Sequence, residues 1–232
     1  MVYVSFSSAG DNGKHVGVPN CFIHADTICD MTALLSERER SKFDTSSDDQ
    51  FYDQPKLVTH ADNGFLRRLQ ALYDEVLSSN DRVFDMMSSW VSHLPSREFQ
   101  TVIGHGLNET ELERNERLDE YFTQNLNRTQ QLPLSDQTVD AVCCALSVQY
   151  LQYPSEVFAE IARILDAGGV LIVSFTNRMF PHKAIRAWRE ATMEGRINLV
   201  REYCEAHGFT VSQCIHERPA GDPFAAVVAR PT

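Results

Sequence analysis

The sequence predicts an α/β fold with a doubly wound, Rossmann-like sheet. Three observations predict it: an apolar run over 139–148, apolar residues at helical spacing over 154–165, and a double-glycine turn that leads into a second apolar run within 166–177. Short continuous apolar runs are typical of strands buried on both faces, and the order strand, helix, glycine turn, strand is typical of a parallel α/β sheet. Because ligands of such sheets bind beyond the carboxyl ends of the strands, we expect functional residues to follow the strands.

The other elements follow from periodicity and from capping residues. A stripe of apolar residues predicts a helix over 65–77, and Asn108, with Glu111 three residues later, has the form of a capping box that opens another helix. Pro154 suits the first turn of the helix over 154–165. The remaining expected strands lie at 82–86, 101–104, 121–126, 209–216 and 224–229, and the remaining helices at about 182–193 and 197–207.

Composition excludes several classes of function. The chain has 232 residues, 43% of them hydrophobic, and a formal net charge of -11, so we expect no broad nucleic-acid or anionic-membrane surface. No apolar run approaches the roughly 18 residues that span a bilayer, and the polar N-terminus lacks a signal-peptide core. We therefore expect a cytoplasmic protein, although an organelle-targeted precursor that has lost its targeting segment fits the same sequence.

The six cysteines and the histidines show no metal-ligand spacing. Cys143 and Cys144 lie in a predicted strand, where neighbours face opposite sides of the sheet, and both are expected to be buried apolar residues. A reduced protein without a metal site is the resulting expectation.

Three segments together resemble a known family. They are Leu132 to Asp140 with the sequence LPLSDQTVD, Ala145 to Leu151 with ALSVQYL, and Glu160 to Leu165 followed by Gly168-Gly169. In this order and at this spacing they are similar to the class I S-adenosylmethionine-dependent methyltransferases, especially the small-molecule "type 11" group. The resemblance implies a seven-stranded sheet, mostly parallel with an antiparallel last strand, and S-adenosylmethionine as the cofactor.

The resemblance also suggests how the chain is divided. Residues 1–50 are polar and turn-prone and are expected to form a loosely ordered N-terminal extension. Residues 51–232 are expected to form the methyltransferase domain, and 51–80 its N-terminal lid helix region, because this part of the family commonly folds over the cofactor.

The first cofactor loop departs from the family pattern. After the first strand the family has an acidic residue and then a Gly-x-Gly loop, whose glycines let the backbone approach the methionine part of the cofactor. Here Asp85 keeps the acid, but Met86, Met87, Ser88 and Ser89 replace the glycine loop. The resemblance therefore implies a rebuilt loop in which the two serines hydrogen-bond the amino-acid end of the cofactor.

The acid that follows the second strand in the family is also replaced. Gly106 stands where that acid accepts hydrogen bonds from the ribose, so Asn108 is the nearest alternative acceptor. Leu107 still suits the apolar wall against adenine.

Two further loops complete the expected cofactor site. Asn125 stands where an acid meets the adenine amino group, and its side-chain carbonyl can accept the same hydrogen bond. Leu126 offers its backbone amide. After the fourth strand, Ser147 and Val148 are the remaining cofactor-binding candidates.

Four side chains are expected to act on the methyl acceptor. Tyr150 follows the fourth strand, where the family lines the methyl-transfer channel, and Arg178 follows the fifth. Arg178, together with Lys183, is suited to hold an acidic substrate. His93, expected on the first helix, and His60 in the lid region are candidate bases because imidazole titrates near neutral pH.

Each of these side chains has a structural alternative: a packed tyrosine, a salt bridge, or a structural histidine. His105 and His182 are taken as surface residues.

Three hypotheses follow. The first is an S-adenosylmethionine-dependent methyltransferase that acts on a small metabolite, which Arg178 and Lys183 suggest is carboxylated. The second is a non-catalytic, methyltransferase-like binding or scaffold protein, because the glycine loop and the ribose acid are missing. The third is a nucleotide-dependent oxidoreductase, which lacks the Gly-x-Gly-x-x-Gly turn that a pyrophosphate needs. The identity of the methyl acceptor and the oligomeric state stay open.

Overall fold

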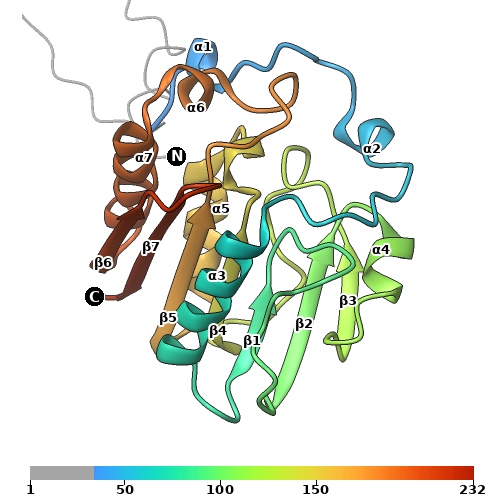
Figure 1. Ribbon diagram of the computed structural model, residues 1–232, viewed down its shortest axis with the longest axis vertical. Coiled ribbons are helices and arrows are strands. Elements are labelled where there is room, and N and C mark those ends of the chain that lie inside the picture. The colour runs from blue at the N-terminus through green and yellow to red at the C-terminus, as the bar shows by residue number, and fades with distance from the viewer. Residues whose placement is uncertain (1–33) are drawn as a thin grey trace, which may run out of the picture. The chain divides into compact units, whose positions relative to one another are not determined.

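The computed structural model describes residues 34–232, and the statements below concern that part of the chain (Figure 1). Residues 1–33, most of the predicted extension, lie outside the described residues, as do Cys21 and Cys29.

A seven-stranded sheet forms the centre of the described part. Its spatial order is β3-β2-β1-β4-β5-β7-β6. The first five strands are parallel, and β7 runs antiparallel to both β5 and β6. The predicted fold class and antiparallel last strand are confirmed. The strands are β1 (Arg82–Asp85), β2 (Thr101–Gly106), β3 (Glu120–Thr123), β4 (Val139–Ala145), β5 (Leu165–Phe175), β6 (Phe209–Glu217) and β7 (Phe224–Pro231).

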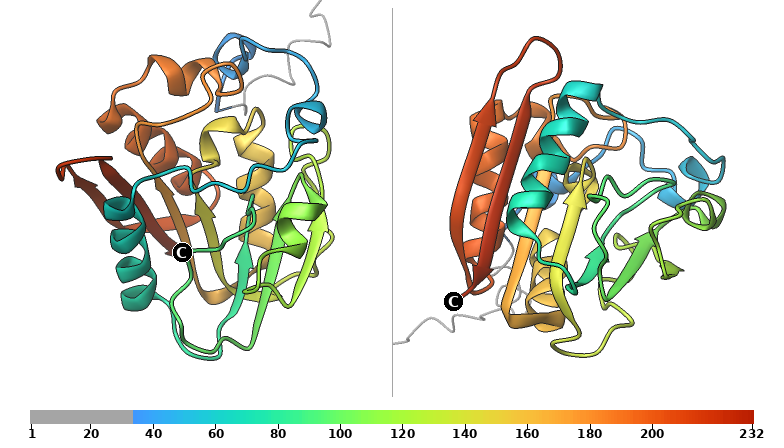
Figure 2. Two further views of the ribbon diagram at one scale, coloured as in Figure 1. Left: turned by 45° about the vertical axis from the view of Figure 1, so that its right-hand side comes forward. Right: turned by 60° about the horizontal axis from the view of Figure 1, so that its bottom comes forward.

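Helices cover both faces of the sheet (Figure 2). The apolar face of α3 packs on one side together with Cys143, and α5 and α7 pack on the other side together with Cys144. Both cysteines are buried, as predicted. The helices of the described part are α1 (Glu37–Arg40), α2 (Asp48–Phe51), α3 (Asn63–Val76), α4 (Glu109–Glu113), α5 (Pro154–Ile164), α6 (Arg186–Glu190) and α7 (Met193–Glu205), with one 3₁₀ turn at Val148–Tyr150.

The connection between β1 and β2 differs most from the prediction. Residues 86–100 form an irregular loop, so the helix expected to carry His93 is absent, and that prediction was wrong. The loop contains Pro95, which cannot continue a helix, and serines that bond to nearby groups in place of helical partners. Met87 and His93 have φ values of 57° and 56°, in the left-handed region.

The double-glycine segment is part of a strand irregularity. Val139 pairs with Leu165 and Ala141 pairs with Val170, so 166–169 bulge out of the β4–β5 pairing. A Cβ on Gly169 would come within 2.8 Å of the Asp140 carbonyl, which explains the need for glycine there. The other boundary differences are confined to element ends. The helix expected at about 182–193 spans only Arg186–Glu190, and the next helix starts at Met193, because Thr192 caps it.

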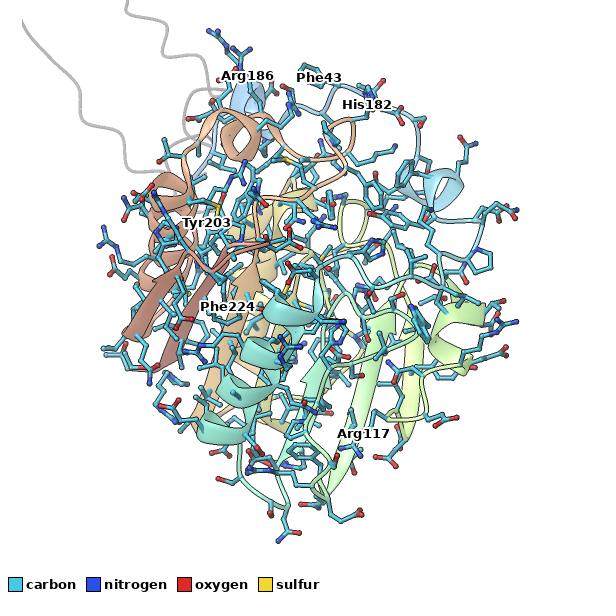
Figure 3. The ribbon with its side chains drawn as sticks, in the orientation of Figure 1. Phe43, Arg117, His182, Arg186, Tyr203 and Phe224 are labelled. Atoms are coloured by element: carbon cyan, nitrogen blue, oxygen red, sulfur yellow. The ribbon has the colours of Figure 1, made fainter. Side chains whose placement is uncertain are left out.

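Residues 34–62 run along the carboxyl edge of the sheet (Figure 1). This N-terminal segment contacts the loop between β5 and α6: the Asp44 amide donates to the His182 carbonyl, and the Arg186 amide donates to the Ser41 carbonyl. Figure 3 shows Phe43, His182 and Arg186 close together at this junction. The expectation that His182 is exposed is confirmed.

Candidate functional site

A cavity of about 360 Å³ lies at the carboxyl edge of the sheet. Its lining comes from the loops that follow β1, β2, β3, β4 and β5, and from residues 48–60 of the N-terminal segment. This is the edge where α/β sheets bind their ligands, and the volume lies in the range of small-molecule sites.

Apart from Lys183, which is described below, all but two of the predicted site residues line this cavity. The exceptions are Met86 and Val148, whose side chains are buried in the apolar core beneath it. These two side chains pack into the core of the sheet and do not reach the cavity, and their assignment to the cofactor stays a prediction. The predicted residues that line the cavity are His60, Asp85, Met87, Ser88, Ser89, His93, Gly106, Leu107, Asn108, Asn125, Leu126, Ser147, Tyr150 and Arg178.

Asp85, at the end of β1, is a buried carboxylate at the cavity. Its Oδ2 accepts a hydrogen bond of 2.6 Å from the Ser88 hydroxyl. Burial raises the pKa of Asp85 to about 6, although hydrogen bonds from Ser88 and Ser92 act in the opposite direction. No cation pairs with this carboxylate among residues 34–232. The site therefore offers a buried acid with hydroxyl partners only, which suits a cationic ligand group.

Met87 takes the left-handed conformation two residues after the acid, within the segment that replaces the glycine loop. Its amide donates to Nδ1 of His105 at 3.1 Å, and its carbonyl accepts from the Ser147 hydroxyl. The loop thus keeps a glycine-like backbone without a glycine, held by hydrogen bonds to β2 and to the loop after β4.

His105 is buried, so the expectation of a surface residue was wrong. Its Nδ1 accepts from Met87, and its Nε2 therefore carries the proton and donates to the Gln124 carbonyl at 2.9 Å. Burial lowers the pKa of His105 to about 4, which keeps the ring neutral. This histidine positions the β1 loop.

Gly106 lies against that loop. A Cβ at Gly106 would stand 2.7 Å from the Ser88 carbonyl, so the position has no room for the acid of the family pattern. Asn108 caps α4 through its Oδ1, and its Nδ2 donates to the carbonyls of Tyr52 and Asp53. The Asn108 amide is thereby engaged in protein contacts.

Glu111, in the first turn of α4, is an acid of the cavity that sequence reasoning missed as a site residue. It is buried, and its two carboxylate oxygens accept from the Lys56 amide and from the Ser89 hydroxyl, each at 2.5 Å. The only sequence signal was its place in the capping box, which reads as structural.

Asn125 and Asn127 join the loop after β3 to α2. The Asn125 Nδ2 donates to Asp49 at 3.1 Å, and its Oδ1 accepts from the Asn127 amide. Asn127 in turn donates to Asp48 and to the Tyr150 carbonyl. These contacts close one side of the cavity.

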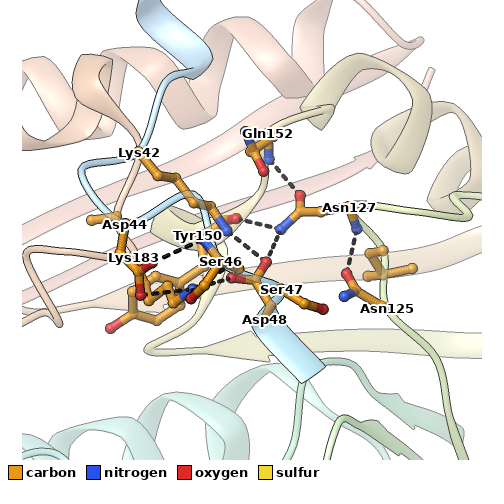
Figure 4. Close-up of polar contacts among 12 residues, drawn as sticks. Lys42, Asp44, Ser46, Ser47, Asp48, Asn125, Asn127, Tyr150, Gln152 and Lys183 are labelled. Carbon is orange, nitrogen blue, oxygen red and sulfur yellow. Dashed lines mark hydrogen bonds and ion pairs between the residues drawn. The ribbon is translucent and has the colours of Figure 1, made fainter. Parts of the chain in front are cut away.

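A buried ion network fixes residues 42–48 over the site (Figure 4). Asp48 accepts from Lys42 at 2.7 Å, and the fully buried Lys183 lies 3.0 Å from Asp44 and 3.5 Å from Asp48. Lys183 also donates to the Ser46 carbonyl. Lys183 does not line the cavity, so its predicted role in holding an acidic substrate was wrong.

Arg178 lines the cavity and also forms a salt bridge. Its Nε lies 2.7 Å from Asp222, and Asp222 and Asp62 accept hydrogen bonds from each other's amides. The arginine thus joins the loop after β5 to the β6–β7 loop and to the start of α3.

Aromatic rings gather on the wall formed by Phe180. Tyr150 stacks on it at 6.1 Å between ring centroids, and His60 and Tyr52 meet it edge-on at 5.5 and 6.5 Å. The Tyr150 hydroxyl accepts from the Phe180 amide at 2.9 Å. Burial raises the pKa values of Tyr150 and Tyr52.

Neither Met86 nor Trp90 fills the cavity. Met86 lies in the core, and the Trp90 indole lies outside the lining and donates to the Val58 carbonyl. The described residues contain no group of His, Cys, Asp or Glu that could hold a metal ion. No helix among them is long and apolar enough to cross a membrane.

Comparison with known proteins agrees with this geometry. Residues 87–173 match the family described as "Methyltransferase domain". A search of curated proteins found no match.

Solved structures share the fold. The [4+2]-cyclase SpnF has a TM-score of 0.55 at 14% identity and covers 76% of this chain and 88% of its own. The PH0226 protein of Pyrococcus horikoshii OT3 has a TM-score of 0.54 at 14% identity, covering 80% and 100%. A SAM-dependent methyltransferase of Aquifex aeolicus has a TM-score of 0.52 at 14% identity, covering 78% and 96%.

The described part of the chain therefore has the fold of class I S-adenosylmethionine-dependent methyltransferases, and residues 87–173 match the methyltransferase-domain family. S-adenosylmethionine is the cofactor that this family implies.

Proposed function

We propose that this protein transfers the methyl group of S-adenosylmethionine to a small-molecule acceptor bound in the cavity at the carboxyl edge. The observation that carries the proposal is the open cavity beside Asp85, which the altered glycine loop does not fill.

The chain's own residues fit the cofactor. Asp85, with Ser88 and Ser92 around it, would hold the ammonium of the amino-acid end, since it is a buried acid without a cationic partner. Glu111 would take the place of the ribose acid, because it is a buried acid that lines the same cavity and Gly106 has no room for a carboxylate. Leu107, Leu126 and Asn125 would face the adenine.

When bound, the cofactor supplies an electrophilic methyl group on a sulfonium sulfur. The protein then has to hold the acceptor atom in line with that bond and to keep water away, which accounts for much of the rate in such displacements. Tyr150, Arg178, His60 and His93 all line the cavity and are the proposed acceptor-side residues.

The charges of the lining favour an uncharged acceptor over a carboxylated one. Asp48, Asp85 and Glu111 are the acids of the lining. Of the cations that line it, Arg178 is paired with Asp222, and the Lys56 amine donates to the Phe51 carbonyl.

Calorimetry tests the proposal directly. S-adenosylmethionine and S-adenosylhomocysteine are titrated into the folded protein, and both should bind. Glu111→Gln removes the charge; its one acceptor oxygen can keep the hydrogen bond from the Lys56 amide, and its NH2 can donate to the Ser89 hydroxyl oxygen. It should weaken binding about tenfold, the effect of losing roughly 1.4 kcal/mol from a charge-assisted bond. Glu109→Gln, on the exposed side of the same helix, is the matched control.

The absence of heat at millimolar ligand, with circular dichroism showing a folded protein, would favour the alternative of a non-catalytic, methyltransferase-like binding protein. That alternative draws on the missing glycine loop and ribose acid. The open cavity supports the enzyme instead.

A further inference from the structure

The histidines of residues 34–232 differ in how their rings are bonded. Both ring nitrogens of His105 and of His207 lie within hydrogen-bonding distance of protein atoms. His60 and His93 line the cavity, and within the described part of the chain no protein atom bonds to either nitrogen of either ring. Two partly buried imidazoles thus face one cavity with their polar atoms available to a ligand.

The backbone of His93 is strained. Its φ of 56° places a β-carbon in the left-handed region, which costs roughly 1–2 kcal/mol for a residue other than glycine. Met87 and Leu146, which also line the cavity, have φ values of 57° and 59°. Such strain persists only where surrounding contacts impose it, and here it fixes the position of an imidazole that bonds to no protein group.

The surroundings of His60 are aromatic on one side and charged on the other. Its ring meets Phe180 edge-on. The Phe180 ring also contacts the rings of Tyr150 and Tyr52. A planar ring is the ligand shape that such a wall stacks best.

Charged and titratable groups around His60 come from several elements. Burial lowers the pKa of His60, the charge of Glu111 on α4 raises it, and that of Lys56 lowers it. Burial, and then the nearby His60, lower the pKa of His93 to about 4. Arg178, which also lines the cavity, is held by Asp222. Of the two histidines that line the cavity, His60 is the one with an acid beside it that stabilises the protonated ring.

We propose that the methyl acceptor is a planar aromatic molecule with a ring hydroxyl, that His60 takes the hydroxyl proton, and that His93 hydrogen-bonds the same oxygen. The inference rests on the proposed function, since it assumes that S-adenosylmethionine occupies the Asp85 side of the cavity. The ring lies against Phe180, and no carboxylate is needed for binding.

The hydroxyl oxygen forms a bond to the methyl carbon, the carbon–sulfur bond breaks, and its electron pair stays on sulfur. The hydroxyl proton moves to His60, which later releases it to water. The products are an aryl methyl ether, S-adenosylhomocysteine and one proton. An amine acceptor would not require a base before transfer, which is why the free imidazoles point to a hydroxyl.

The first experiment uses the full chain with S-adenosylmethionine and a panel of probes. The panel holds catechol and 2-naphthol as planar hydroxyls, cyclohexanol as a non-planar one, aniline as an amine and benzoate as a carboxylate. Mass spectrometry of the products should show methyl ethers from the aromatic hydroxyls only. In a separate binding assay with S-adenosylhomocysteine present, catechol should shift the nitrogen-15 resonances of His60 and His93.

Variants then separate the two histidines. His60→Gln should lower kcat at least about 100-fold, the usual size of a base's contribution, and leave S-adenosylhomocysteine affinity within about twofold. In the wild type, kcat should fall as the pH drops through the pKa of His60, and His60→Gln should lack that fall. His93→Gln should mainly raise KM. His182→Gln, at an exposed position outside the cavity, is the control.

The outcomes are distinguishable. If S-adenosylhomocysteine does not bind, the proposed function fails. If it binds but no aromatic hydroxyl is methylated or shifts the imidazole resonances, or if His60→Gln matches the wild type, the acceptor assignment is overturned while the proposed function stands. Methylation of benzoate or aniline alone would also overturn it.

Discussion

The Ser88 carbonyl oxygen lies over the α-carbon of Gly106, so that a Cβ there would approach it to 2.7 Å. The two loops are further joined by a 2.6 Å bond from the Ser88 amide to the His105 carbonyl. The unusual serine loop and the missing ribose acid are thus linked, because the path of the loop at Ser88 leaves no room for an acidic side chain at position 106.

Restoring the acid at that position should therefore harm the protein. Gly106→Asp forces a backbone oxygen aside, and we expect a loss of about 2 kcal/mol or more in the free energy of unfolding, measured by urea titration. Gly168→Ala is the control, since its added Cβ would meet only Asp166 at 3.8 Å. Equal stability of Gly106→Asp and the wild type would show that the two loops separate easily.

The left-handed backbone of Met87 can be tested by comparing two truncations. Met87→Gly and Met87→Ala both lose the thioether side chain, but only glycine takes a φ of 57° without strain. The glycine variant should be more stable than the alanine variant by about 1 kcal/mol in thermal unfolding. The same pair at Gln70, exposed on α3, should show the opposite order by a similar amount.

Asp85 should give a pH dependence of stability with a defined sign. Burial raises its pKa from 3.8 to about 6, so between these values the folded protein binds more protons than the unfolded chain. Its contribution to stability is present below pH 3.8 and is lost as the pH rises through 6. Asp85→Asn removes this loss and should be more stable than the wild type above pH 6, by up to roughly 3 kcal/mol.

Urea titrations of wild type and Asp85→Asn from pH 4 to pH 8 check this prediction. The buried His105 and the partly buried His93, whose lowered pKa values act with the opposite sign, are present in both proteins and cancel in the difference. Asp53→Asn, at an exposed position, is the control. A constant difference across this pH range would contradict the prediction.

Lys183 should be essential for attaching the N-terminal segment. Lys183→Met leaves the Ser46 carbonyl and the carboxylate of Asp44 without their buried cation, and we expect a loss of about 3 kcal/mol or more. Arg186→Ala removes only a partly exposed helical pair with Glu190 and should cost less than about 0.5 kcal/mol. Chemical denaturation measures both, and similar losses would show that the network carries no special stability.

The fold could be predicted because its signals are local. Apolar runs, Pro154 at a helix start and the Asn108 cap each determine a few neighbouring residues, and the structure confirms these elements. The irregular loop after β1 could not be predicted, because its shape depends on His105 from β2 and Ser147 from the loop after β4, which are distant in sequence.

The site was predictable to the extent that it follows strand ends. Asp85, Tyr150 and Arg178 reach the cavity for that reason. Glu111 was missed as a site residue because its position in the sequence is that of a capping acid. The role predicted for Lys183 was wrong because its partners, in residues 44–48, are distant in sequence. Contacts between distant segments leave no periodic trace in a sequence.

The position of β7 bears on how the protein is made. It follows β6 in sequence but lies between β5 and β6 in the sheet. While a ribosome is still translating, β6 can emerge with no strand to pair with, and it stays unpaired until the next strand appears. The β6–β7 hairpin then joins the edge of β5 as a unit. Strands β1 to β5, whose loops line the cavity, can therefore fold before synthesis of β6 and β7 is finished.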